Sequence, residues 1–540
     1  MTASENVLYA VQQMSLTQKI GQMIMVDFSG YELTDALRKN IAENQWGGII
    51  LFAKNVKNRA QVTELCADLQ KAAREGGVPA PLFISVDQEG GIVNRIAFAE
   101  TPVSPGNMAL GAAGNPEYAR EAARIYGQDL RNIGFNLNFA PCVDINNNPF
   151  NPIIGVRSFG ESAAAVAEMG VQAARGYRDG GVIPCGKHFP GHGDTATDSH
   201  LDLPALKHSV ERLKEVELAP FQALIDDKIE MLMTAHITYP ALESQPGLPA
   251  TLSERILSGL LRQEMGFDGV IITDSMSMLA IARNFGVAQA AVMSVQAGAD
   301  IVLACGTREA QLETLEALLN AVRDGKISEA QVDASVERIL SLKEKFLRRP
   351  VPPTPDREAL DFMKHVARAA ITLVKDDAAR IPVKRKKLLM VGPTRLPTSP
   401  LGEMDQPLPL GDLLRERGFT VEERSFSLQD PKFDPAPFVE AAADCEAIVL
   451  CLFARHRLAV SQMELALSLA DSGKPMVVAA INSPYILTDI PWAETYLCTY
   501  GYTRPTLEAL ADVLSGRVRP QGRLPMSIPG LFAAGHRVGE

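Results

Sequence analysis

The chain has 540 residues, of which 46% are hydrophobic, so it is long enough to form two domains with sizeable cores. Its formal net charge of -11 at pH 7 argues against nucleic acid or an anionic membrane surface as the main partner. The seven cysteines are scattered and form no paired metal motif, which favours buried thiols over a disulfide framework.

The first residues of the chain contain neither a basic segment nor the apolar segment of a secretory leader. No apolar run reaches the length of about 18 residues that a membrane-spanning helix needs. We therefore expect a cytoplasmic protein without a membrane partner, or a secreted one if a leader has been removed.

Eight short apolar runs in the first 305 residues alternate with helical patterns. The runs cover residues 22–28, 47–52, 82–87, 135–144, 182–189, 230–236, 269–274 and 299–305. Helical spacing is found between most of them, at residues 60–74, 116–133, 162–179, 209–226 and 252–265. Doubly buried strands that alternate with helices indicate a parallel sheet, and eight units in roughly 250–350 residues predict a (β/α)8 TIM-type barrel.

Several of these runs end in polar residues. They are Asp87, Asp144, the pair Lys187 and His188, His236, and Asp274. One such residue alone is more often a cap or a satisfied hydrogen-bonding group, but here five of the eight runs share the feature. Because the carboxyl ends of barrel strands meet at one face, we expect an active site there.

Residues 187–200 are the most concentrated group of ionisable side chains. This segment contains one lysine, three histidines and two aspartates, with glycines on both sides of His192. It follows an apolar run, so the ionisable groups lie where a buried strand opens into a loop. Loops in that position commonly carry catalytic residues.

A domain boundary is predicted near residue 350. Four prolines in the six positions 350–355 follow a helical pattern at residues 328–346, which indicates a stiff linker. The expected domains are a catalytic barrel at residues 1–349 and a second domain at residues 350–540.

Short strands alternate with helices again in the second domain. Strand patterns occur at residues 387–392, 419–424, 447–453, 475–481 and 495–500, with helical patterns at 461–471 and 506–514. This order predicts an α/β three-layer sandwich. The turn after its first strand lacks a dinucleotide-binding fingerprint, and the chain contains no P-loop, so no cofactor is expected.

Five motifs together resemble those of glycoside hydrolase family 3, in its β-N-acetylglucosaminidase branch. They lie at residues 86–91, 151–160, 187–200, 233–236 and 272–276. The resemblance spans most of residues 15–305, and the 187–200 motif is highly specific. The second domain resembles the family's C-terminal sandwich, including residues 522–529, and some members of the branch lack that domain.

The resemblance implies a retaining glycosidase mechanism and assigns its catalytic residues. Asp274 matches the nucleophile, and His200 matches the acid/base, with Asp198 as its partner. An imidazole with an ordinary pKa of about 6.5 can donate and accept a proton near neutrality. The structural alternative for Asp274 is the N-cap of the helix that is expected to follow it.

The resemblance also implies the residues that bind the sugar. They are Asp87, Arg95, Arg157, Lys187 and His188. Charged donors and acceptors in a dry cleft can discriminate between sugar epimers. The alternatives are structural ion pairs for the arginines and a polar network for Lys187 and His188. Relatives often have arginine where this chain has Ile92, which weakens the comparison at Arg95.

The implied substrate is a terminal β-linked N-acetylglucosamine, from peptidoglycan-derived muropeptides or from chitooligosaccharides. A cytoplasmic member would act in peptidoglycan recycling. We expect a monomer or a homodimer that binds small sugars, with no metal.

Three alternative functions remain open from the sequence. His188, His192, Asp194 and His200 could bind zinc, although their spacing is not that of a helical zinc motif. A sugar-binding protein without catalysis would be expected to lack the nucleophile or the loop histidine. Phosphorolysis is the third alternative, because a histidine acid/base does not repel phosphate as a carboxylate would.

Overall fold

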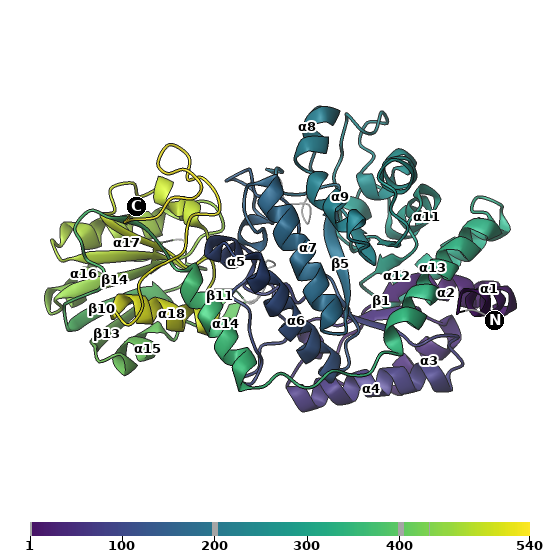
Figure 1. The fold of residues 1–540 in the computed structure, drawn as a ribbon, viewed down its shortest axis with the longest axis horizontal. Coiled ribbons are helices and arrows are strands. Elements are labelled where there is room, and N and C mark those ends of the chain that lie inside the picture. Colours follow the sequence, from purple (N-terminus) through teal and green to yellow (C-terminus); the bar gives the residue numbers. More distant parts are fainter. Residues whose placement is uncertain (1–2, 197–202, 398–403, 431, 540) are drawn as a thin grey trace.

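The computed structural model describes residues 3–196, 203–397, 404–430 and 432–539. Two sheets organise these residues, and Figure 1 shows them side by side along the long axis of the molecule. The first sheet has eight strands in the order β7-β6-β5-β4-β3-β2-β1-β8, and neighbouring strands run parallel. A parallel bridge between Ile272 and Ile301 joins its two edges, so the predicted barrel is confirmed.

Each of the eight predicted barrel strands is present. Their bounds are β1 Ile24–Val26, β2 Gly48–Ile50, β3 Phe83–Val86, β4 Leu137–Asn138, β5 Ile183–Phe189, β6 Met231–Thr234, β7 Val270–Ile272 and β8 Val302–Ala304. Most strands are shorter than the apolar runs, because these runs continue into the turn after the strand, whereas β5 extends to the end of its run at Phe189. Those turns bring the polar strand ends to one face.

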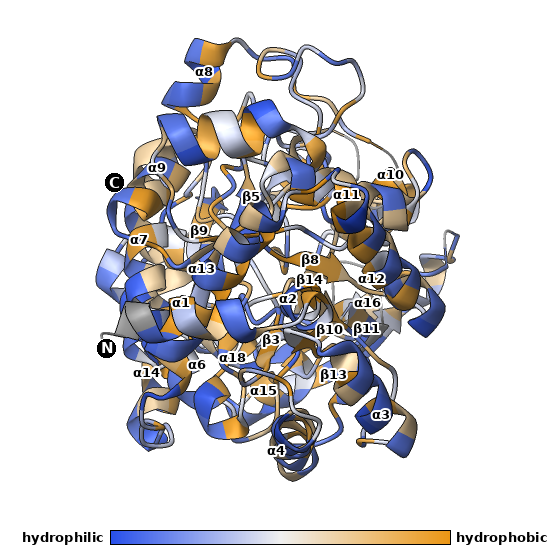
Figure 2. Ribbon diagram, turned by 90° about the vertical axis from the view of Figure 1, so that its right-hand side faces the viewer, coloured by the Kyte–Doolittle hydropathy of each residue, from blue (hydrophilic) through white to orange (hydrophobic). Residues whose placement is uncertain are grey.

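Helices surround the barrel, and most of them turn their apolar sides inward (Figure 2). They are α1 Ala3–Gln13, α2 Leu16–Gln22, α3 Asp35–Asn44, α4 Arg59–Glu75, α5 Asn107–Ala113, α6 Pro116–Ile133, α7 Ala163–Asp179, α8 Val210–Glu215, α9 Ala219–Asp226, α10 Leu279–Ala282, α11 Val287–Ala297, α12 Arg308–Arg323 and α13 Glu329–Leu347. The single helix predicted over residues 209–226 is wrong. Pro220 lies in the first turn of α9, and a proline ring is tolerated there but not inside a longer helix. The helix predicted at 252–265 is a π-helix at Arg255–Glu264.

The second sheet is mixed, in the order β13-β10-β14-β15-β16-β9. Its strands are β9 Thr372–Asp376, β10 Lys387–Pro393, β13 Thr420–Phe426, β14 Ala447–Leu452, β15 Met476–Ala480 and β16 Thr495–Cys498. Edge strand β9 runs antiparallel to β16 and was not predicted. The small hairpin of β11 Arg395–Pro397 and β12 Met404–Pro407 was also missed.

Helices cover both faces of this second sheet. They are α14 Arg357–Ala370, α15 Leu410–Glu416, α16 Ala436–Ala443, α17 Val460–Asp471 and α18 Arg504–Leu514. Alternate residues of β14 belong to two different cores, with Ile448 in one and Val449 in the other. A sheet buried on both faces is the middle layer of a sandwich, as predicted.

The proline-rich segment joins the two parts as an extended strap along α6. Asn132 Nδ2 donates to the carbonyl of Pro352 at 2.9 Å, and Thr354 Oγ1 donates to Asn132 Oδ1 at 2.9 Å. Helix α14 follows, and its Met363 and Val366 belong to the barrel core. Its later residue Ala367 belongs to a core of the second sheet, so α14 packs on both parts. The division at residue 349 stays a prediction.

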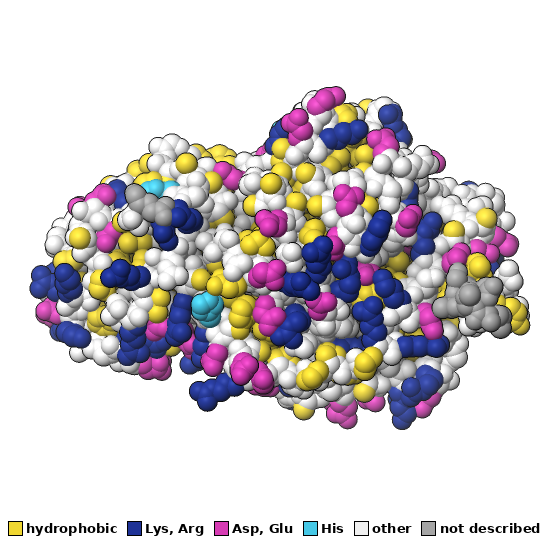
Figure 3. All heavy atoms as spheres, viewed as in Figure 1, with side chains coloured by type: hydrophobic (Ala, Val, Ile, Leu, Met, Phe, Trp, Pro, Cys, Tyr) yellow, Lys and Arg dark blue, Asp and Glu magenta, His cyan; other side chains and the backbone are white. Residues whose placement is uncertain are grey.

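The surface charges and the cysteines are as the sequence composition indicates. Charges of both signs are interspersed on the face in Figure 3. All seven cysteines are free and buried. Among the described helices, none combines the length and the apolar character that a membrane crossing requires.

A buried lysine lies at the end of the barrel opposite the polar strand ends. Lys343 of α13 is 2% exposed, and its Nζ donates to Gln22 Oε1 at 2.7 Å and to the carbonyl of Gly47 at 2.8 Å. The ammonium also lies 4.8 Å from the centre of the Phe83 ring. Burial lowers the pKa of Lys343 to about 7.

This lysine should make stability depend on pH. Its pKa is about 10.4 in an unfolded chain, so between pH 7 and about 10 the unfolded state binds more protons than the folded state. The free energy of unfolding should therefore rise by about 2 kcal/mol from pH 7 to pH 9, at 1.36 kcal/mol per pKa unit. Urea unfolding followed by tryptophan fluorescence should show this rise in the wild type and its loss in Lys343→Met.

Lys345→Met is the matched control, because Lys345 lies on the same helix with its side chain 54% exposed. The control should keep the pH dependence of the wild type. An equal dependence in Lys343→Met and the wild type would show that Lys343 stays charged in the fold.

Candidate active site

A cavity of about 500 Å³ opens at the carboxyl ends of the barrel strands. Six of the eight predicted site residues line it: Asp87, Arg95, Arg157, Lys187, His188 and Asp274. They come from β5 and from the segments that follow β3, β4 and β7, so distant parts of the chain converge as the barrel predicted. The predicted acid/base residues Asp198 and His200 lie outside the described residues.

Glu89 holds the two cations of the site together. Its carboxylate accepts from Arg157 Nε at 2.9 Å and from Arg157 Nη2 at 2.8 Å, and Lys187 Nζ lies 2.7 Å from its Oε1. Lys187 Nζ also lies 2.7 Å from Asp87 Oδ1. Glu89 was not among the predicted site residues, although it belongs to the same motif as Asp87.

Burial and charge act in opposite directions on this cluster. Burial alone would raise the pKa of Glu89, but Arg157 and Lys187 hold that pKa well below its usual range. Burial alone would lower the pKa of Lys187, but Asp87 and Glu89 hold it above its usual value. Glu89, Arg157 and Lys187 therefore stay charged at neutral pH.

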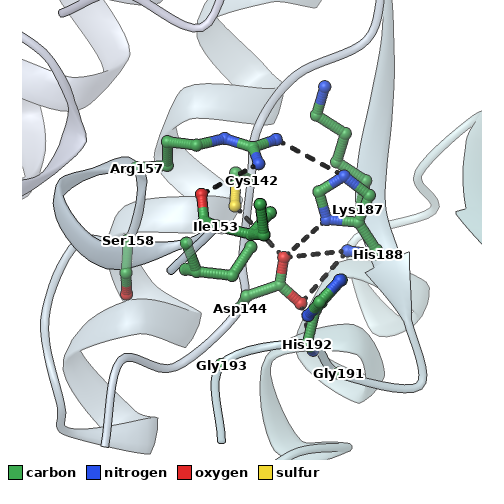
Figure 4. Close-up of polar contacts among 12 residues, drawn as sticks. Cys142, Asp144, Ile153, Arg157, Ser158, Lys187, His188, Gly191, His192 and Gly193 are labelled. Atoms are coloured by element: carbon green, nitrogen blue, oxygen red, sulfur yellow. Dashed lines mark hydrogen bonds and ion pairs between the residues drawn. The ribbon is translucent and has the colours of Figure 1, made fainter. Parts of the chain in front are cut away.

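Asp144 organises the histidines of the site (Figure 4). Its Oδ2 accepts from His188 Nδ1 at 2.7 Å, and its Oδ1 accepts from the backbone N–H of His192 at 2.7 Å. Burial alone would raise the pKa of Asp144, but His188 and His192 lower it to about 2. The ionised carboxylate fixes the His188 ring with its Nε2 3.4 Å from Arg157 Nη2.

His192 is buried beside Asp144 and His188. Burial lowers the pKa of His192 to about 4, so its ring is neutral near pH 7. Its Nδ1 lies 2.9 Å from Thr195 Oγ1, which ties the ring to the segment that leads toward residue 197. From the sequence, His192 was predicted only as a possible zinc ligand.

Asp274 follows β7 and faces the cavity. Its Oδ1 accepts from the backbone N–H of Ser275 at 2.7 Å. The next helix begins at Leu279 and has Met278 as its N-cap, so the helix-cap alternative for Asp274 is wrong. The side chain is half-buried, which leaves a carboxylate at the wall of the cavity.

Arg95 also reaches the cavity. Its backbone N–H donates to Gln88 Oε1 at 2.8 Å. Its buried Nη1 has no hydrogen-bond partner among the described residues. Because a buried donor without a partner is costly, this nitrogen is suited to a ligand oxygen.

The ligands considered for zinc do not converge in the described part of the chain. His188 and His192 meet at Asp144, whereas Asp194 Oδ2 lies 2.6 Å from His208 Nε2. Arg157 does form the structural ion pair of the alternative reading, and Lys187 does belong to a polar network, but the same two side chains line the cavity. Structural pairing and ligand contact are therefore compatible here.

The chain is similar to known glycoside hydrolases over most of its length. Residues 15–342 match the glycosyl hydrolase family 3 N terminal domain. β-Hexosaminidase A of Pseudoalteromonas piscicida is 31% identical and aligns over 95% of this chain and 97% of its own length. A β-hexosaminidase of Thiobacillus denitrificans is 35% identical over 55% of this chain and 81% of its own length.

A solved structure is similar in both parts. It is a family 3 β-N-acetylglucosaminidase from Paenibacillus sp. str. FPU-7, with 40% identity and a TM-score of 0.89. The match covers 95% of this chain and 98% of that chain. The chain therefore belongs to glycosyl hydrolase family 3, as its five motifs predicted.

Proposed function

We propose that the protein is a retaining β-N-acetylglucosaminidase that removes terminal β-linked N-acetylglucosamine. The observation that carries the proposal is the cavity at the strand ends, which is lined both by the Asp274 carboxylate and by the Arg157–Glu89–Lys187 cluster. The names of the relatives, a β-hexosaminidase and a β-N-acetylglucosaminidase, support this substrate class. Muropeptides and chitooligosaccharides are the proposed natural sources.

The charged cluster is suited to an uncharged sugar. Its fixed ammonium and guanidinium groups offer donors to sugar hydroxyls, and the Asp87 carboxylate offers an acceptor. Because Glu89 already orients both cations, little side-chain entropy is lost when a sugar binds. Arg95 Nη1 adds a further donor.

The proposed reaction has two steps. Asp274 attacks the anomeric carbon while imidazolium of His200 protonates the leaving oxygen, which gives a covalent glycosyl-enzyme and a free aglycone. His200, now neutral, takes a proton from a water molecule. The oxygen of that water attacks the anomeric carbon and breaks its bond to Asp274, which releases the sugar and the free carboxylate. Asp198 orients the imidazole and favours its protonated form.

Replacement of the nucleophile should stop turnover. Asp274→Asn should abolish cleavage of an aryl β-N-acetylglucosaminide, because an amide cannot attack the anomeric carbon, while circular dichroism stays unchanged. Asp268→Asn is the matched control, since Asp268 precedes the same strand at the opposite end of the barrel and is exposed. Activity near the wild-type level in Asp274→Asn would exclude this nucleophile.

Loss of the acid/base should depend on the leaving group. His200→Ala should slow cleavage of a disaccharide far more than the first step on an activated aryl glycoside, which needs little protonation. Azide needs no general base, so it should restore the second step and yield a β-glycosyl azide, identified by mass spectrometry and NMR. Equal losses on both substrates and no azide product would make His200 structural, with Asp194 the next candidate.

Replacement of Asp198, the proposed partner of His200, should change the pH profile of the reaction. Asp198→Asn should lower turnover less than His200→Ala and move the optimum to lower pH, because the imidazole loses a neighbouring charge that favours its protonated form. The measurement is kcat/KM against pH. An unchanged optimum would mean that Asp198 does not act on His200.

Hydrolysis and phosphorolysis differ in the second step, in which either water or phosphate attacks the glycosyl-enzyme. With hydrolysis, the rate should be the same with and without phosphate, and the product should be free N-acetylglucosamine. Formation of the sugar 1-phosphate, measured by NMR, would instead establish the phosphorylase alternative.

A further inference from the structure

The loop after β4 contributes Ile153 and Arg157 to the lining of the cavity. This β4 loop, residues 144–161, contains Asp144, which fixes both histidines, and Arg157, which lines the cavity. Its two ends are joined, because the N–H of Asn146 donates to the carbonyl of Gly160 at 2.9 Å. Any shift of the loop ends would therefore move Asp144 and Arg157 together.

The second domain holds the first end of the β4 loop through one hydroxyl group. Tyr485 lies in a short 3-10 helix, η5 Pro484–Thr488, which follows β15. Asn146 Nδ2 donates to the Tyr485 hydroxyl at 2.9 Å. Asn146 is fully buried and Tyr485 is 5% exposed, so no water competes for this bond.

The other end of the β4 loop is held by the C-terminal segment. Glu161 accepts from the Ser527 hydroxyl at 2.7 Å and from the Ser527 N–H at 2.8 Å. The Glu161 N–H donates to the carbonyl of Pro525 at 3.1 Å. Gly160 allows this approach, since a Cβ there would lie 2.5 Å from the same carbonyl oxygen.

These contacts connect directly to the groups of the cavity. Asn146 is two residues from Asp144, whose carboxylate accepts from the backbone N–H of both His188 and His192. The Arg157 guanidinium lies at the far side of the same loop and contacts both Glu89 and His188. Figure 4 shows Asp144, Arg157 and the two histidines converging.

We propose that Tyr485 is a positioning residue and that the second domain thereby completes the active site. Without its hydroxyl, the buried Asn146 amide has no acceptor there, and the loop relaxes to find one. Asp144 then shifts, and the sugar-binding groups His188 and Arg157 lose their mutual geometry. The effect on turnover rests on the proposed glycosidase function, whereas the effect on the loop does not.

Tyr485→Phe removes the hydroxyl and keeps the ring. With an aryl β-N-acetylglucosaminide, we expect kcat/KM to fall roughly tenfold, the scale of one buried hydrogen bond, with most of the loss in KM because Arg157 and His188 bind the sugar. Hydrogen exchange read by mass spectrometry should show faster exchange in residues 144–161 and at the backbone amides of His188 and His192.

Tyr500→Phe is the matched control. Tyr500 is 1% exposed, and its hydroxyl donates to Thr372 Oγ1 at 2.7 Å, entirely within the second domain. This variant removes the same group from an equally buried site, so its thermal midpoint should fall by a similar amount. Its kcat/KM and the exchange of residues 144–161 should match the wild type.

Asn146→Ala tests whether the effect passes through the proposed contact. The double variant with Tyr485→Phe should be no worse than Asn146→Ala alone, since both remove the same bond. Additive losses would overturn the positioning role, as would identical kcat/KM and exchange in Tyr485→Phe and Tyr500→Phe. If the wild type cleaves no β-N-acetylglucosaminide but exchange still responds to Tyr485→Phe, the proposed substrate is wrong and the positioning role stands.

Discussion

The arrangement of the cavity depends on one buried anion, Glu89, placed between two buried cations. Arg157 and Lys187 are only 8% and 2% exposed, and charges so far from water are tolerated only when they are paired. With Asp87 the cluster has two charges of each sign, so an uncharged ligand can enter without upsetting its balance. The cluster has no net charge, although each of its groups is charged. It therefore gives strong, directed hydrogen bonds without attracting ions.

A second network, centred on Asp144, meets the first at His188 and Arg157. The Asp144 carboxylate orients the His188 imidazole through its ring nitrogen and accepts a hydrogen bond from the backbone N–H of His192. The two networks touch where His188 Nε2 lies 3.4 Å from Arg157 Nη2. The barrel scaffold thus fixes strand ends, but side-chain pairs between loops fix the directions in which functional groups point.

Local patterns were sufficient to predict the barrel, the sandwich and the face of the barrel at which the cavity lies. Doubly buried strands appear as apolar runs, and a polar residue after such a run marks the functional face, which is how Asp87 and Asp274 were found. Edge strand β9 was missed because it follows α14 directly, without the turn residues that usually separate elements. The division of residues 209–226 into two helices depended on Pro220, which the helical spacing alone did not take into account.

The pairings that hold the site together could not be predicted in this way. Glu89 and Arg157 are 68 residues apart, and Asn146 and Tyr485 are 339 residues apart, so no periodic pattern relates them. The family resemblance implied five sugar-binding positions, which stay predictions, but it did not imply the anion Glu89 that pairs with Arg157 and Lys187. The residues expected to transfer protons, Asp198 and His200, lie outside the described residues.

The dual packing of α14 limits how this protein can have evolved. Met363 and Val366 cover apolar barrel surface, while Ala367 packs against the second sheet. An ancestor consisting of the barrel alone would need polar substitutions on that surface, or another helix to shield it from water. Gene fusion or truncation at the proline-rich strap is therefore not a neutral event, because each change in domain content must be accompanied by changes in barrel sequence far from the catalytic face.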